Sequence, residues 1–338
     1  MRTKAAFLLL LAALALILGV ALGSVTIAPA EIWGVIAHKI WGRELPLDIK
    51  ATTVAIVWNL RLPRALLAFI VGAGLAISGA VMQSVLRNPL ASSYTLGVSS
   101  GASLGACLVI LYGLTLPFAG VLTLPLVGFL SGLLTILLAV AFASTLDGQM
   151  ENHTIVLVGM VFSLFVNAIT SLLSALSGEH LQRLIFWQMG SFSMKDWLAV
   201  AILFPVVVLI GLLVLHFHRE MDMLTFGEEQ ARSMGVDLRR VKWILLVAAA
   251  AVTGSAVAFV GVIGFVDLVA PHIVRRLFGA RHALVIPLSM ILGGAFMVVC
   301  DLAARTLAAP VELPVGAVTA LLGAPFFAWV YFQKRARI

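Results

Sequence analysis

Charged side chains are scarce in this chain of 338 residues: Asp, Glu, Lys and Arg together make up 11% of it. Hydrophobic residues, in contrast, make up 62%, and the mean hydropathy is +1.12. A water-soluble fold of this length could not bury so much apolar surface. The composition therefore predicts a protein that crosses a lipid bilayer several times.

The sequence also lacks the motifs of nucleotide chemistry and of catalysis. No lysine ends a Gly-x-x-x-x-Gly-Lys-Ser/Thr loop, so the chain does not cradle nucleotide phosphates in that way. No His-Glu-x-x-His motif or nucleophile elbow occurs. The two cysteines, Cys107 and Cys300, lie in apolar stretches and form no metal-ligand pattern. We therefore expect no catalytic residue, no metal site and no cofactor in this chain.

Long apolar runs are what the sequence has instead. A helix needs about 20 apolar residues to cross a bilayer. The stretch 243–274 is longer than one crossing, and Gly261, Gly264 and Pro271 interrupt it, so it suits either a kinked span or two short ones. The other candidate spans lie near 5–27, 65–86, 96–116, 118–143, 155–176, 197–215, 283–303 and 313–332.

Basic residues favour the second of these possibilities, because cytoplasmic loops collect Lys and Arg. With two short spans in 243–274, the basic clusters at 219–242, 275–281 and 334–337 all lie on one side. We therefore expect an all-α polytopic membrane protein with about ten transmembrane helices, one integral domain over 1–338 and both termini in the cytoplasm. The net charge of +7 reflects this topology, and no nucleic-acid partner is expected.

Three segments outside this pattern need an interpretation. The first apolar run follows Arg2 and Lys4 as a signal peptide would, but it is longer than the usual apolar region of 7–15 residues, so we expect a span. The loop 29–60 contains Trp33 and Trp41, and its apolar residues recur at helical spacing, which favours a helix at the membrane interface. The loop 177–196 suits a short interfacial helix, which could also cap a pathway entrance.

Several sequence blocks together carry a family resemblance. They are Arg61-Leu62-Pro63-Arg64, Arg87-Asn88-Pro89-Leu90-Ala91, Leu96-Gly97-Val98-Ser99-Ser100-Gly101-Ala102, the run 259–279, Asp301-Leu302-Ala303-Ala304-Arg305, Glu312-Leu313-Pro314-Val315-Gly316 and Gly323-Ala324-Pro325-Phe326-Phe327. With them, residues 61–327 resemble the permease subunit of FecCD-type (type II) ABC importers for iron-siderophores, haem or cobalamin. The resemblance implies a homodimer in the cytoplasmic (inner) membrane, two ABC ATPase subunits that bind ATP and Mg, and an extracytoplasmic solute-binding protein.

The resemblance also implies a docking role for three arginines. Arg61, Arg64 and Arg305 match residues that receive acidic side chains of the binding protein, and arginine forms forked pairs with carboxylates. An alternative for Arg61 and Arg64 is that they extend along the membrane interface to water. Arg305 has another candidate partner in Asp301, one helical turn away.

Two further sets of positions match the gate and the ATPase contact of the family. Asn88 and Leu90 match a cytoplasmic gate, and Asn152 and His153 match its other half less closely, since His153 also suits a solvated loop. In the loop of about 217–241, Gly227 and Gly235 bracket a short helix with acids in its first turn. A plain solvated loop is the alternative. By resemblance the residues that couple to the ATPase are Leu224, Gly227, Glu228, Glu229, Ala231 and Gly235.

Two positions depart from the family pattern, which has proline at Ser93 and glycine at Asp267. A carboxylate near a membrane span is unfavourable unless it is solvated or paired, so Asp267 is either paired structurally or part of a substrate path. The alternative function is an ion-coupled secondary transporter that works without an ATPase. Such a protein would need ionisable groups deep in several spans. This sequence offers only Asp267 and Asp301, both near span ends.

Overall fold

The computed structural model describes residues 2–23, 25–47, 49–148, 150–176 and 178–335. Residues 336 and 337 of the basic cluster at 334–337 therefore lie outside the described part of the chain. Helices dominate the described residues, and none of these residues forms a β-strand. The predicted all-α class is confirmed.

Ten helices of the described chain correspond to the ten predicted spans. Seven of the helical segments are long and apolar enough to cross a membrane, whereas α5 and the described apolar part of α15 are shorter, and α13 has 13 residues. The ten are α1 (Arg2–Ala21), α4 (Leu62–Val85), α5 (Val98–Tyr112), α6 (Thr123–Leu146), α7 (Asn152–Ala175), α9 (Trp197–His216), α12 (Leu238–Val260), α13 (Val266–Phe278), α14 (His282–Thr306) and α15 (Val315–Arg335).

The stretch 243–274 divides into two helices, as the charge pattern requires. Gly261 ends α12 with φ +81°, and a Cβ atom there would lie 2.1 Å from the Trp187 carbonyl oxygen. The expectation of two short spans is wrong for the first of them, because α12 begins at Leu238 and has 23 residues. Asp237 starts this helix by accepting a hydrogen bond from the Arg240 amide at 3.1 Å.

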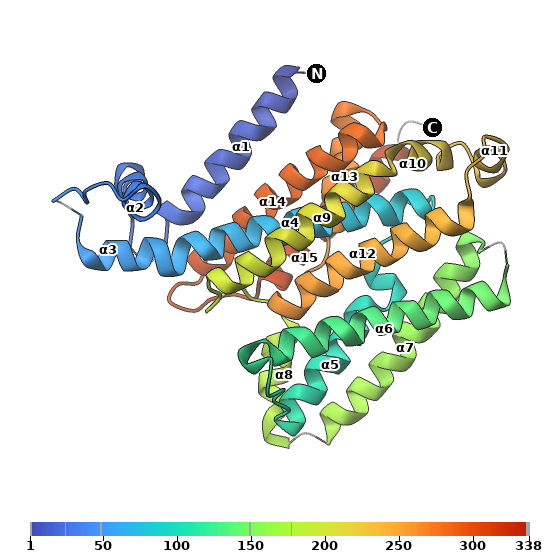
Figure 1. The fold of residues 1–338 in the computed structure, drawn as a ribbon, viewed down its shortest axis with the longest axis horizontal. Helices are drawn as coiled ribbons and strands as arrows, with labels where there is room; N and C mark the ends of the chain where they lie inside the picture. Colours follow the sequence, from blue (N-terminus) through green and yellow to red (C-terminus); the bar gives the residue numbers. More distant parts are fainter. Residues whose placement is uncertain (1, 24, 48, 149, 177, 336–338) are drawn as a thin grey trace.

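Short helices lie at the two ends of the molecule (Figure 1). At one end are α2 (Pro29–Trp41) and α3 (Ala51–Ala55), where a π-helical turn, Ile56–Arg61, leads into α4. At the other end are α10 (His218–Leu224) and α11 (Glu228–Ser233). The Trp33 and Trp41 rings of α2 pack 5.7 Å apart and are exposed, as a helix at the membrane interface requires. The loop 177–196 contains α8 (Leu181–Gln188).

Basic residues that the sequence predicts on one side do lie at the α10–α11 end. The Lys4 ammonium donates to the Leu277 carbonyl oxygen at 3.4 Å, which brings the start of α1 beside the end of α13. Asp222 of α10 accepts from the His282 backbone amide at 2.9 Å, which brings α10 beside the start of α14. The sorting of loops into two sides is therefore consistent with the fold.

Helix α4 is the centre of the molecule. It packs against α1, α9, α12, α13 and α14, and every residue from Ile70 to Val85 is buried. Two of these contacts bring backbone against backbone. A Cβ atom on Gly72 would lie 2.2 Å from the Gly293 carbonyl oxygen of α14, and one on Gly79 would lie 1.7 Å from that of Asp267 in α13. Small residues allow such close approach of helices within lipid.

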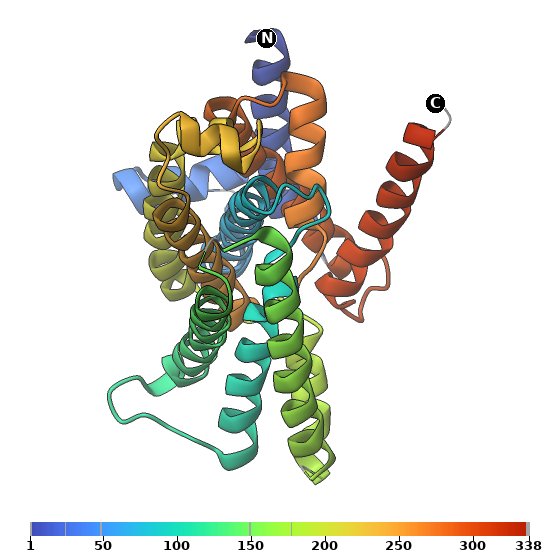
Figure 2. The same ribbon diagram turned by 90° about the vertical axis from the view of Figure 1, so that its right-hand side faces the viewer.

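The remaining helices form an outer group. Helices α5, α6 and α7 pack on one another and meet α4 chiefly through α12. Figure 2 shows α15 standing apart from the other helices. A turn at 189–191 joins distant parts: the Ser191 amide donates to the Val260 carbonyl oxygen at 2.8 Å, and the Val315 amide donates to that of Gly190 at 3.2 Å. The end of α12 is thereby linked to the start of α15.

Replacing Gly79 with alanine tests the central packing. We expect G79A to lower the stability of the purified protein by about 1–3 kcal/mol, because the new methyl group forces α4 and α13 apart. The control is G254A, a buried helical glycine of α12 whose Cβ atom would meet its nearest neighbour at 3.6 Å. Thermal unfolding in detergent should show G254A unchanged or more stable, and equal effects of the two variants would contradict this packing.

Candidate functional site

The turn between α10 and α11 requires glycine. Gly227 has φ +125° and ψ 158°, a conformation that residues with a side chain rarely adopt. A Cβ atom there would also lie 2.2 Å from Gln230 Oε1. Gly235 follows α11 with φ +89°. The short helix predicted between the two glycines is therefore confirmed, with Glu228 and Glu229 in its first turn.

Not all of the predicted coupling residues face outward. Leu224 and Ala231 are fully buried in the hydrophobic core of this chain. They hold α10 and α11 against the other helices and are not placed to touch another protein, which corrects the direct contact expected of them. Phe226 lies between them in sequence and is 71% exposed. In the sequence, Phe226 is a single aromatic residue directly before Gly227. The family resemblance does not select it as a coupling residue.

Lys242 connects α11 to the rest of the chain. Its side chain is completely buried, and its ammonium donates to Glu228 Oε1 at 2.8 Å and to the Met150 carbonyl oxygen at 2.7 Å. From the sequence, Lys242 is one of several basic loop residues. The sequence does not predict its burial or its two hydrogen bonds, because both partners come from other segments of the chain.

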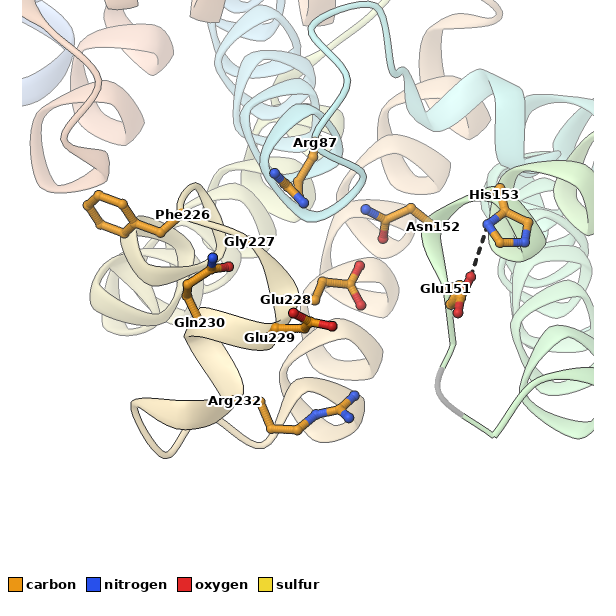
Figure 3. A pocket seen from close by; sticks show the side chains of 10 residues that line it. All are labelled: Arg87, Glu151, Asn152, His153, Phe226, Gly227, Glu228, Glu229, Gln230 and Arg232. Carbon is orange, nitrogen blue, oxygen red and sulfur yellow. Dashed lines mark ion pairs between the residues drawn. The ribbon is translucent and has the colours of Figure 1, made fainter.

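A cavity of about 700 Å³ opens beside α11. It brings the predicted gate residues Asn152 and His153 together with the predicted coupling residues Gly227, Glu228 and Glu229 (Figure 3). Its wall is completed by Arg87, Glu151, Phe226, Gln230 and Arg232. The start of α7 and the helix α11 thus form two sides of one space.

The predicted gate residues differ in their surroundings. The buried Oδ1 atom of Asn152 has no hydrogen-bond partner among the described residues. His153 lies in the first turn of α7, is 77% exposed and lies 3.2 Å from a Glu151 carboxylate oxygen, so its side chain is solvated although it is not in a loop. Asn88 Oδ1 accepts from the Leu90 amide at 2.9 Å in the exposed turn after α4. Asn88 and Leu90 do not line the cavity, so one copy of the described chain does not join the two halves of the predicted gate.

At the α2 end, Arg61 is an interior residue with 7% of its surface exposed. It donates to the carbonyl oxygens of Val20 at 3.0 Å and Ala21 at 2.9 Å, and also to that of Val25. These groups lie at and after the C-terminus of α1, where carbonyls lack helical partners and favour a cation. The side chain does not extend to water, so that alternative is wrong for Arg61.

Arg64 and Arg305 share one carboxylate. Arg64 forms a forked pair with Asp301 at 2.9–3.1 Å and a second pair with Glu312 at 2.9 Å. Arg305 lies 3.5 Å from Asp301 and donates to the Gly19 carbonyl oxygen. Arg305 therefore does lie beside Asp301, as the alternative expected, but Arg64 is closer to the Asp301 carboxylate than Arg305 is. Arg64 likewise does not extend freely to water.

The three predicted docking arginines do line one hollow of about 460 Å³, with Glu312 at its wall. Burial alone would raise the pKa of Glu312, but the hydrogen bonds and charge of Arg64, together with Ser193 and the charge of Arg305, hold the pKa below its usual value. The structure brings the arginines together, yet many of their donors already have acceptors within the chain. Their docking role stays a prediction.

Asp267 and Ser93, the two departures from the family pattern, each form a hydrogen bond through the side chain. Asp267 is buried and accepts a hydrogen bond from the Ser92 hydroxyl, while its other oxygen has no partner among the described residues. The Ser93 hydroxyl bonds to that of Ser78 in α4. The carboxylate thus has one hydrogen bond, from Ser92, and the choice between a structural role and a place in a substrate path stays a prediction. Across the described residues, no group of three or more His, Cys, Asp or Glu side chains is placed to hold a metal ion.

Comparisons with known proteins agree with this architecture. The model of the FecCD transport family matches residues 9–333. The chain is 41% identical to the ABC transporter permease protein YvrB of Bacillus subtilis, over 95% of this chain and 91% of that protein. It is 41% identical to the cobalamin import system permease protein BtuC of Halobacterium salinarum, over 87% and 78%. A solved structure of an inward-facing metal-chelate type ABC transporter matches with a TM-score of 0.84 and 29% identity, over 98% of this chain and 100% of that one.

Removing Arg64 tests whether the arginine cluster stabilises the fold. We expect R64M to lower stability by about 3–5 kcal/mol, because it deprives the buried Asp301 of its closest cation. Thermal unfolding should show part of that loss restored in R64M/D301N. The control is R183M at an exposed position of α8. If R64M were as stable as R183M, the cluster would have no structural role.

Proposed function

The chain belongs to the FecCD transport family and is a multi-pass permease subunit of an ABC importer; we propose that its cargo is a metal chelate, namely an iron-siderophore, haem or cobalamin. A separate ATPase subunit hydrolyses ATP. The metal-chelate transporter among the solved structures and the cobalamin permease among the relatives support this cargo class. A chelate is carried intact, so its transport requires no covalent chemistry from this chain.

The single observation that carries the ATPase contact is the exposed Phe226 on an anchored pair of helices. Leu224 and Ala231 fix α10 and α11 to the core, so Phe226 is presented on a rigid support. A fixed, exposed aromatic side chain is typical of an energetically dominant residue in an interface. We propose that one ATPase subunit docks on α10 and α11 of each permease copy. This places the α10–α11 end and both termini in the cytoplasm and the protein in the cytoplasmic (inner) membrane.

A second copy of the chain completes the proposed importer. Helices α7 and α15 expose large apolar side chains, among them Leu164, Phe165 and Leu321, and α15 stands apart from the other helices (Figure 2). Exposed apolar surface within the membrane suits either lipid or another protein. We propose that two copies pair across these helices and enclose the pathway, and that the binding protein docks at the α2 end, over the hollow that Arg61, Arg64 and Arg305 line.

Transport then requires two arrangements of rigid helices. Binding and hydrolysis of ATP can shift their populations only by interacting differently with the two arrangements. An ion-coupled carrier is less well supported, since Asp267 and Asp301 are each bonded within the fold at the ends of helices. The mechanism proposed here needs no titrating group along the pathway.

The ATPase contact is tested by F226D. We expect the permease to remain folded but its affinity for the ATPase to fall by about tenfold or more, because a charge replaces the central apolar residue of the interface. Co-purification and ATP-driven chelate uptake into vesicles are the measurements. The control is L47D, at a fully exposed leucine of the α2 end. Normal uptake by F226D, or uphill uptake by the permease without any ATPase, would contradict the proposal.

A further inference from the structure

Lys242 is unusual because its charged side chain is completely buried. Lysine is almost never fully buried unless it is paired, since removal of its charge from water is costly. Here the ammonium has one carboxylate partner and one backbone partner, at 2.8 and 2.7 Å. Because water does not reach the Lys242 ammonium, both hydrogen bonds are stronger than they would be at a surface.

The two partners belong to segments that are far apart in the sequence. Glu228 is the first residue of α11, and Met150 lies in the turn two residues before α7 begins at Asn152. Met150 itself is fully buried with φ +53°, and the Glu151 amide donates to an Asp147 carboxylate oxygen at 2.7 Å. Lys242 therefore holds α11 and the entrance to α7 to the same point of α12.

Helix α7 has few direct contacts with the central helices α4 and α12. It packs on α5, α6 and the short helix Ser93–Leu96, on the outer side of the molecule, and much of its surface is exposed within one copy. Its first residues, Asn152 and His153, form the wall of the cavity opposite α11 (Figure 3). A displacement of α11 that changes the position of Glu228 thus acts, through one buried ammonium, on the turn that sets the position of α7.

We propose that Lys242 is a positioning residue that transmits movement of α11 to the start of α7, and so couples the ATPase to the cavity wall at Asn152. This inference rests on the proposed function, because it assigns to the same importer the contact through which the ATPase acts. It also gives Glu228 a role that differs from that of Glu229. Both line the cavity, but Glu228 is the one bonded to Lys242.

The matched pair E228Q and E229Q tests this difference. E228Q keeps the size of the side chain and a carbonyl acceptor but removes the charge that balances the buried ammonium. The assembled importer, with its ATPase and binding protein in vesicles, should show about tenfold less chelate transported per ATP hydrolysed in E228Q, a size typical of coupling free energies. E229Q should lower the ratio less than E228Q does, because the bond to Lys242 comes from Glu228, and K242M should lower it at least as much as E228Q.

The ratio separates coupling from simple damage. A variant that only destabilises the fold reduces transport and ATP hydrolysis together, because fewer complexes are active, and leaves their ratio unchanged. If K242M does not fold, E228Q alone decides. An unchanged ratio in E228Q, an equal fall in E228Q and E229Q, or loss of the ATPase from E228Q would overturn the role of Lys242. Absence of ATP-driven uptake in the unmodified importer would instead overturn the proposed function.

Discussion

Close packing around α4 is the constraint on which the rest of the structure depends. Within a bilayer, burial of apolar side chains gives little driving force for helix association, so contact at short range must supply it. Gly72 and Gly79 allow α14 and α13 to approach α4 backbone to backbone. Because α4 also contacts α1, α9 and α12, the placement of these helices, and of the cavity and hollow at the two ends, follows from its small residues.

Much of the fold could be predicted because its signals are local. Apolar run length and glycine or proline interruptions predicted the ten helices, and Gly227 and Gly235 predicted the bounds of α11. The start of α12 was less accessible, since Arg239, Arg240 and Lys242 look like loop residues although Asp237 already begins a helix. Pairings were not predictable at all when they depend on tertiary structure. The carbonyls bonded to Arg61 and the partners of Lys242 lie 14 to 92 residues away in sequence.

The two ends of the molecule use charge in a similar way. At the α2 end, Arg61 and Arg64 are bonded to carbonyls of α1 and to the carboxylates of Asp301 and Glu312. At the α10–α11 end, Lys242 is bonded within the chain as well. Each of these cations stabilises a junction between helices. Residue type alone therefore did not show that these cations are bonded within the chain, whereas Phe226 is 71% exposed.

Helix α12 is bonded to another element at each of its ends, and the turn at 189–191 provides the link at its C-terminal end. Lys242 fixes the first turns of this helix to α11, and the Ser191 amide bonds to its last carbonyl, while Gly190 accepts from the first residue of α15. A helix of 23 residues is about 35 Å long. If it pivots as a straight rod, a tilt of about 5° moves one terminus by about 3 Å relative to the other. Any tilt of α12 therefore changes its junctions with α11 and α15 together, and it also shifts the packing of this helix on α4 and α6.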